Sequence, residues 1–279
     1  MRWQPTLDRT MIVAPHPDDD VIAAGGLIQR VVANGGEVSV VYVTDGENNP
    51  WPQRYMKRKW MLGADDRAEW GAMRRREALA SLERLRVPSE ATRFLAFPDQ
   101  KITALARRGD MRLRDELRQA IESFRPTLIV SPSGRDVHSD HRTIAWFTHA
   151  AAGAIDVTTY VVHSAPRADR LIGTVILSER EQRRKREAIE CHASQLLLSR
   201  ARFLKHAGPT ESFCAPEFDL VRVDSTVRQW SLALAHALGV VTGAVPAPTS
   251  HPIMFMKPTA VPRASGRVTS STEAKMFAS

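Results

Sequence analysis

A short apolar run near the start of this chain leads directly into a cluster of acidic side chains. Residues 11–14 read Met-Ile-Val-Ala, and the next segment places His16, Asp18, Asp19 and Asp20 close together. An apolar run that ends in a proline-interrupted turn is typical of a buried strand followed by a loop. In open α/β sheets, ligand sites lie at the carboxyl ends of such strands. Clustered carboxylates repel one another unless a positive charge lies between them, and a divalent cation is the simplest candidate.

The same design occurs a second time. Residues 127–130, Thr-Leu-Ile-Val, are typical of another buried strand, and a Ser-Pro-Ser-Gly turn follows them. The turn leads into a segment that holds Asp136, His138, Asp140 and His141. Two clusters at the same topological position indicate a shared functional site more specifically than either cluster does alone.

Strand and helix patterns alternate through the first 200 residues. We expect strands at residues 37–44, 93–96, 157–163 and 171–177, and helices at residues 20–34, 74–85, 111–124, 141–154 and 178–198. The polar stretch from residue 51 to residue 70 is expected to be a flexible lid or an irregular helix. This alternation predicts an α/β fold with a mostly parallel sheet and helices on both faces.

Length and composition favour one main domain with a peripheral extension. The chain has 279 residues and 43% hydrophobic residues, enough to bury a sizeable core. We expect a domain over residues 1–224, ending in a strand at 218–223, and an extension over residues 225–279 with a packed helix at 230–241 and a disordered tail. The uncharged stretch 230–256 contains prolines and small residues, which favours a packed helix over a membrane span. Nothing at the N-terminus resembles a signal peptide, so a cytoplasmic location is expected.

The chain carries a net charge of +8, and its basic residues gather at 54–76 and 180–186. This pattern favours solvated helix faces, with attraction of an anionic substrate or a nucleic acid as the functional alternative. No helix-turn-helix, zinc-finger or RNA-binding signature occurs, so we expect no nucleic-acid partner. Cys191 and Cys214 lack the spacing of a metal motif and are expected to be free thiols.

Two motifs, His-Pro-Asp-Asp-Asp at residues 16–20 and His-Ser-Asp-His at residues 138–141, stand among shorter stretches in a fixed order. The shorter stretches are residues 44–47, Arg74 with Glu77, residues 94–99, Arg125-Pro126 and Ser194-Gln195. Together they resemble the PIG-L/LmbE-like N-acetylglucosaminyl deacetylases, over about residues 10–215, with serine in place of the proline of the second motif. The resemblance implies a Rossmann-like α/β fold and a zinc-dependent amidohydrolase activity.

The resemblance further implies that His16, Asp19 and His141 hold the metal. Two imidazoles and one carboxylate suit a catalytic Zn²⁺ ion, which keeps a further position for water, and Fe²⁺ could occupy the same ligands. Asp18 would be the general base, because adjacent side chains diverge and Asp18 can face the water rather than the metal. Asp20 is expected to cap the following helix or to support the site as a second acid. For each of these residues, a backbone hydrogen bond or a helix cap is the structural alternative.

Other positions matched through the resemblance have supporting roles. His138 would donate to the developing oxyanion and to the leaving amine, and Asp140 would orient His138. Arg74 and Asp99 match positions that hold sugar hydroxyls, a task suited to a guanidinium and a carboxylate. Glu47 is expected near the mouth of the site. The structural alternatives are a surface loop for His138, a helix cap for Asp140 and a turn for Asp99.

The remaining histidines lack a motif and are expected to be structural or on the surface: His149, His163, His192, His206, His236 and His251. Trp51, Trp60 and Trp70 are expected to pack rather than to stack on a sugar. The most specific prediction is a zinc-dependent hydrolase that removes an N-acyl group, usually acetyl, from a small amino-sugar substrate. The alternatives are an amidase for a thiol conjugate or an antibiotic intermediate, a metal-dependent phosphoesterase, and a non-catalytic sugar-binding protein. The sequence leaves the oligomeric state open.

Overall fold

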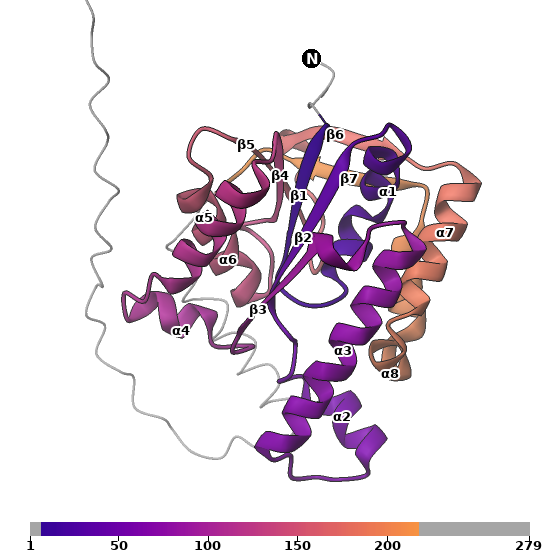
Figure 1. The fold of residues 1–279 in the computed structure, drawn as a ribbon. Coiled ribbons are helices and arrows are strands. Elements are labelled where there is room, and N and C mark those ends of the chain that lie inside the picture. Colours follow the sequence, from indigo (N-terminus) through magenta and orange to yellow (C-terminus); the bar gives the residue numbers. More distant parts are fainter. Residues whose placement is uncertain (1–6, 218–279) are drawn as a thin grey trace, which may run out of the picture.

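The computed structural model describes residues 7–217, which form a seven-stranded sheet between two layers of helices (Figure 1). In chain order the strands are β1 (Arg9–Ala14), β2 (Glu37–Thr44), β3 (Thr92–Phe97), β4 (Leu128–Pro132), β5 (Asp156–Tyr160), β6 (Leu171–Ile176) and β7 (Thr210–Cys214). Their order in the sheet is β3-β2-β1-β4-β5-β7-β6. The first five strands pair in parallel, and β7 is antiparallel to β5 and β6. The expected α/β fold with a mostly parallel, Rossmann-like sheet is therefore confirmed.

Helices cover both faces of the sheet. They are α1 (Asp19–Ala33), α2 (Pro50–Lys57), α3 (Ala64–Arg84), α4 (Ile102–Arg107), α5 (Arg112–Phe124), α6 (Ser139–Ala152), α7 (Glu179–Glu190) and α8 (Ala193–Leu204), with 3-10 turns η1 (Ser89–Ala91), η2 (Ala168–Arg170) and η3 (Lys205–Ala207). Figure 1 shows α4, α5 and α6 together on one side of the sheet and α3, α7 and α8 on the other. No helix between residues 7 and 217 combines the length and the apolar character needed to cross a bilayer.

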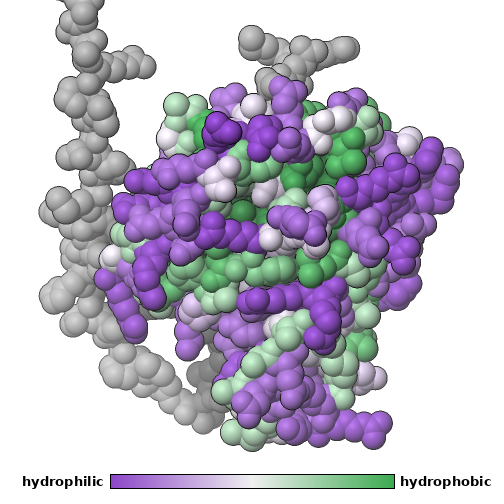
Figure 2. All heavy atoms as spheres, viewed as in Figure 1, coloured by the Kyte–Doolittle hydropathy of each residue, from purple (hydrophilic) through white to green (hydrophobic). Residues whose placement is uncertain are grey.

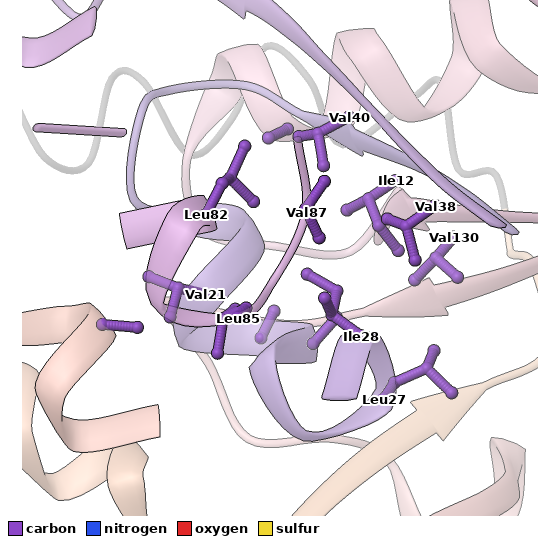
Figure 3. Close-up of a cluster of buried hydrophobic side chains, with 14 of the residues drawn as sticks. Ile12, Val21, Leu27, Ile28, Val38, Val40, Leu82, Leu85, Val87 and Val130 are labelled. Atoms are coloured by element: carbon purple, nitrogen blue, oxygen red, sulfur yellow. The ribbon is translucent and has the colours of Figure 1, made fainter. Parts of the chain in front are cut away.

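The alternation of side chains along the strands builds two hydrophobic cores. In β1, Ile12 and Ala14 join one core, and Met11 and Val13 join the core on the opposite face. Successive side chains of a strand point to opposite faces, so an uninterrupted apolar run is required where both faces are covered. Figure 3 shows the first core, in which β1, β2 and β4 pack against α1 and α3. The apolar run of β1 thereby holds the first motif at the edge of a rigid sheet.

The polar stretch after β2 is more regular than the sequence predicts. It forms α2 and the first ten residues of α3, which begins at Ala64 rather than at residue 74. Asp66 stabilises this start, because it accepts hydrogen bonds from Gly63 N, Lys57 Nζ and Lys59 Nζ. Figure 2 shows hydrophobic and hydrophilic residues interleaved over the α2–α3 hairpin. The prediction that the tryptophans pack is confirmed for Trp70, which is buried, and is wrong for Trp51 and Trp60, which are 47% and 70% exposed.

The helix expected at residues 178–198 is two helices, α7 and α8. They separate because Glu77 of α3 accepts hydrogen bonds from the backbone N–H and the hydroxyl of Ser194, which ties the start of α8 to α3. Helix α4 and strand β7 were not expected from the sequence. The strand expected at 218–223, the helix expected at 230–241 and the extension over 225–279 lie outside the described residues.

A buried ion pair ties α7 and β7 to α1. Lys185 Nζ lies 2.6 Å from Glu211 Oε1 and donates to Ile22 O over 2.9 Å, and both charged side chains are 1% exposed. Glu211 also accepts the backbone N–H groups of Gly26 and Leu27. Removing one partner of such a pair leaves an uncompensated buried charge. We therefore expect Lys185→Ala to lower the free energy of unfolding by about 3–5 kcal/mol in urea denaturation.

A matched control for Lys185→Ala is Arg183→Ala on the same helix, since Arg183 is exposed and pairs with the exposed Glu179. Exposed pairs of this kind contribute about 0–1 kcal/mol, so this variant should unfold close to the wild type. Equal losses of unfolding free energy in the two variants would show that the buried pair stabilises the fold no more than the exposed pair does.

Candidate functional site

The loops that follow the parallel strands meet at the carboxyl edge of the sheet and enclose a cavity of about 1040 Å³. Its lining includes His16, Asp18, Asp19, Arg74, Asp99 and His138. Both sequence clusters therefore contribute to one cavity, as their shared topological position predicts. The first cluster stands at the start of α1 and the second at the start of α6, where the positive ends of the helix dipoles favour carboxylates.

His16, Asp19 and His141 meet at the floor of this cavity. All three are buried, and each offers one ligand atom within 4.8 Å of the others. Asp19 Oδ2 lies 3.0 Å from His16 Nδ1 and 3.2 Å from His141 Nε2. His16 and Asp19 line the cavity, and His141 lies buried behind them. Two imidazoles and one carboxylate are ligands of the kind that catalytic zinc sites use.

His141 is fully buried, and its two ring nitrogens face carboxylate oxygens without a hydrogen bond of good geometry among residues 7–217. Asp136 Oδ2 lies 3.3 Å from Nδ1, on the side away from Asp19. Burial lowers the pKa of His141, but the Asp19 and Asp136 carboxylates outweigh burial and raise the pKa to about 9. These surroundings stabilise a positive charge, and the orphaned ring nitrogens fit a metal ligand supported by a carboxylate on its far side.

Two further groups of side chains are close enough to hold an ion: Asp136, His141 and His163, and His16, Asp99 and Asp140. Each shares a histidine with the first group. Each of the three groups has at least one member that lines the cavity and one that lies behind it. The group of His16, Asp19 and His141 is distinguished by Asp18, which lines the cavity and whose pKa is shifted by all three of its members.

Asp18 occupies the N-cap position of α1 but makes no capping hydrogen bond with its side chain. Its backbone φ of 148° lies in a region that non-glycine residues rarely adopt, at a cost of about 1–3 kcal/mol. Oδ2 lies 3.0 Å from Arg74 Nη2, and the side chain lines the cavity. Burial raises the pKa of Asp18 to about 6, against the opposing effect of Arg74. A strained, buried carboxylate that titrates near neutrality suits proton transfer.

Arg74 and Asp99 both line the cavity, but each is also bound to the protein. Arg74 donates to Gly46 O and Pro17 O, besides its contact with Asp18. Asp99 Oδ1 lies 3.1 Å from His16 Nε2, so Asp99 supports a candidate ligand.

Glu47 does not line the cavity. It accepts the backbone N–H of Asp99 over 2.8 Å and so positions that residue. Glu47 therefore does not lie at the mouth of the site, contrary to the prediction from the sequence. It supports Asp99 from outside the cavity lining.

His138 lines the cavity with a buried Nδ1 that has no hydrogen-bond partner. Burial and the neighbouring histidines lower its pKa to about 2, so the imidazole is neutral at pH 7 and donates as a neutral N–H group. The prediction that Asp140 orients His138 is wrong for this structure: Asp140 Oδ2 accepts the backbone N–H of Gln100 over 2.7 Å, and no hydrogen bond joins it to His138 in the described range 7–217. Asp140 instead anchors the loop after β3 to the start of α6.

Asp20 lies in the first turn of α1, one residue beyond the start of the helix, so the prediction that it caps this helix is wrong. Both of its carboxylate oxygens are buried, close to the Tyr42 hydroxyl but with no hydrogen bond of good geometry in the part of the chain that the structure describes. Burial raises its pKa to about 7, partly offset by the Tyr42 hydroxyl. Asp20 is a supporting acid beneath the motif.

Asp136 contacts the candidate site although the sequence assigns it no role. Its Oδ1 accepts the backbone N–H of His138, and its Oδ2 accepts those of Val162 and His163. It thereby joins the loops after β4 and β5 beneath His141. Its position in the loop after a buried strand, two residues before the second motif, is the signal that could have revealed it.

Two histidines expected to be structural or on the surface line the cavity instead, namely His163 and His206. His163 lies beside His138 and His141, with ring centroids 5.6 Å and 5.0 Å away. By contrast, His192 is fully buried with no hydrogen bond to its ring, in agreement with a structural role. Neither His163 nor His206 belongs to a motif, so only folding of the chain brings them beside the two motifs.

Known proteins of related sequence include a 1D-myo-inositol 2-acetamido-2-deoxy-alpha-D-glucopyranoside deacetylase of Saccharopolyspora erythraea, which is 29% identical over 180 residues. The match covers 57% of this chain and 58% of that protein, so the chain spans a little over half the length of this relative.

Two solved structures share the fold. The A40926 pseudoaglycone deacetylase Dbv21 has a TM-score of 0.58 at 23% identity, covering 75% of this chain and 97% of that one. The 4-carboxy-2-hydroxymuconate hydratase GalB of Pseudomonas putida has a TM-score of 0.58 at 19% identity, covering 88% and 99%. A deacetylase and a hydratase thus share this architecture, and the fold alone does not select the reaction.

Residues 11–152, just over half of the chain, match the sequence profile of the family described as PIG-L: GlcNAc-PI de-N-acetylase. This span begins in β1, ends in α6 and contains both the motif at residues 16–20 and the motif at residues 138–141. The resemblance found in the motifs is thus confirmed, and the chain belongs to the PIG-L family.

Proposed function

We propose that this protein is a metal-dependent hydrolase that removes an N-acyl group, usually acetyl, from an amino-sugar substrate. The observation that carries the proposal is the position of Asp18 beside the group of His16, Asp19 and His141 at the floor of one cavity. The relative from Saccharopolyspora erythraea and Dbv21 are both deacetylases by name, which supports the reaction class.

The proposed ion is Zn²⁺, held by His16, Asp19 and His141, and Fe²⁺ suits the same ligands. When bound there, the ion supplies Lewis acidity that activates water and polarises the substrate carbonyl. Asp136 would hold the imidazole of His141 from its other side, which fixes the orientation of this ligand.

In the proposed mechanism, Asp18 accepts the proton of the attacking water, since a carboxylate with a pKa near 6 is ionised at pH 7. Arg74 holds this carboxylate in place. His138 donates its neutral N–H to the carbonyl oxygen as negative charge develops there. When the carbon–nitrogen bond breaks, Asp18 returns its proton to the departing nitrogen, and the products are a carboxylate and a free amine.

The proposed substrate is a small N-acylated amino sugar. Asp99 lines the cavity beside His16 and would accept hydrogen bonds from sugar hydroxyls. Arg74 lines the cavity as well, and its Nε has no hydrogen-bond partner between residues 7 and 217. We keep both as proposed substrate contacts. The cytoplasmic location and the domain boundary at residue 224 stay predictions.

The test is free-amine release from a panel of N-acetylglucosamine derivatives, comparing the chelator-treated protein with the same protein after Zn²⁺ or Fe²⁺ is restored. We expect amine only with metal restored. Phosphate esters in the same panel test the phosphoesterase alternative, and acylated thiol conjugates test the amidase alternative. Stoichiometric metal with no release from any member would contradict the deacetylase proposal and favour a binding function.

A further inference from the structure

The outer wall of the cavity is built from the end of α8 and the turn η3. Arg202, Phe203, Lys205 and His206 line the cavity here, far along the chain from both motifs. The loop after β5, residues 162–165, also lines the cavity and carries no acidic side chain. We call Arg202, Lys205 and His206 the basic rim.

Charge is divided between the floor and the rim of this cavity. The acidic residues in its lining are Asp18, Asp19 and Asp99, and all three are buried at the floor. Arg202 and Lys205 are exposed at the rim, and neither forms an ion pair with a carboxylate in the part of the chain that the structure describes. Arg200, which precedes them on α8, pairs with Glu190 over 2.6 Å. At the end of α8 and in η3, the two cations that line the cavity are thus without a carboxylate partner among residues 7–217.

The surroundings of His206 show that the electrostatic potential at the rim is positive. Burial, together with Lys185, Lys205, His163 and Arg202, lowers its pKa to about 4. The neutral ring can donate one hydrogen bond, and an anion placed beside it would relieve the repulsion among the rim cations.

The size of the cavity indicates that the substrate carries a further group attached to its amino sugar. A volume of about 1040 Å³ lies at the upper end of small-molecule sites, which span roughly 300–1000 Å³. If the scissile amide lies beside His16 and Asp19 at the floor, the remainder of the substrate extends toward the rim. An anion could not bind beside Asp18 and Asp99 without repulsion, whereas Arg202 and Lys205 would attract it.

We propose that the basic rim is a subsite for an anionic group, a carboxylate or a phosphate, on the part of the substrate remote from the scissile amide. This inference rests on the proposed function for the orientation of the substrate. Arg202 would bind the anion through its planar guanidinium, and Lys205 and His206 would supply further donors.

The test uses pairs of ligands that differ in charge. Binding of glucosamine 1-phosphate is compared with binding of methyl glucosaminide by calorimetry, and binding of 4-carboxyphenyl glucosaminide with binding of the phenyl glucosaminide. Turnover is measured on the corresponding N-acetyl compounds. We expect the anionic member of at least one pair to bind about tenfold more tightly at low salt, and this preference to fall as salt screens the charges. The two pairs separate a phosphate subsite from a carboxylate subsite.

The double variant Arg202→Gln/Lys205→Gln should lose the preference, and Arg202→Lys should retain part of it. Arg200→Gln is the matched control, because it removes the same charge from the same helix outside the cavity and should keep the full preference. A wild type that binds both members of each pair equally, or a double variant that keeps its preference, would overturn the subsite.

The two proposals fail separately in this experiment. Charge-dependent binding without amine release would support the subsite and contradict the deacetylase activity. Amine release at equal rates from the charged and uncharged members of each pair would support the deacetylase activity and contradict the subsite.

Discussion

Asp18→Asn should lower kcat/KM for amine release by about 10²–10⁴-fold while leaving metal binding close to the wild type. Asparagine keeps the shape of the side chain but cannot take a proton from water. Asp18 is not one of the proposed ligands, and its carboxylate contacts Arg74 rather than the histidines. The measurements are steady-state amine release and metal content by elemental analysis.

Asp20→Asn is the matched control for Asp18→Asn. Asp20 is equally close to the ligands in sequence and fully buried, and its pKa of about 7 leaves much of it protonated at neutral pH. An amide imitates that protonated acid, so the loss of activity should be far smaller. If the two variants lost activity equally, or if Asp18→Asn kept wild-type turnover, Asp18 could not be the base.

The same assignment fixes the direction of the pH dependence. A general base must be deprotonated, so kcat/KM should fall as pH decreases through the pKa of Asp18, which is about 6 in this structure. A bound cation favours the carboxylate and moves this limb to lower pH. Loss of the acid limb in Asp18→Asn, measured on its residual activity, would assign the limb to this residue.

A second large effect is expected for His141→Ala, which should abolish both metal binding and amine release. The imidazole is one of two histidines in the proposed ligand group, and its burial leaves no space for a replacement from solvent. We expect substoichiometric metal after dialysis and turnover near background, with partial recovery when metal is supplied in excess.

Asp136→Asn provides the graded comparison for His141→Ala. It weakens the contact behind His141 without deleting a ligand, so metal affinity should fall by about 10–100-fold. Full metal content in His141→Ala would show that the ion binds elsewhere, and the group of His16, Asp99 and Asp140 would then be the one to test.

Some features could be predicted because they depend on contacts between neighbours in the sequence. The apolar run at residues 11–14 predicts β1, since only a strand covered on both faces needs continuous apolar residues. The boundaries of β2 were predicted at residues 37–44, where it is found. Motif spacing likewise brought His16 and His141 to the same edge, because each follows a parallel strand.

Other features depend on partners that are distant in the sequence. Helix α3 begins ten residues early because Asp66 binds two lysines of the preceding segment. The resemblance implied that Asp140 orients His138, yet its carboxylate accepts the backbone N–H of Gln100 in the loop after β3.

The sequence by itself determined the alternating α/β order, the edge of the sheet that carries the site and the residues of its two motifs, because strand periodicity and motif spacing are local properties of the chain. Only the tertiary structure decided that Asp136 supports His141, that Arg74 contacts Asp18 and that the end of α8 forms the basic rim. These arrangements join segments tens to hundreds of residues apart, and the packing of helices on the sheet sets their distances.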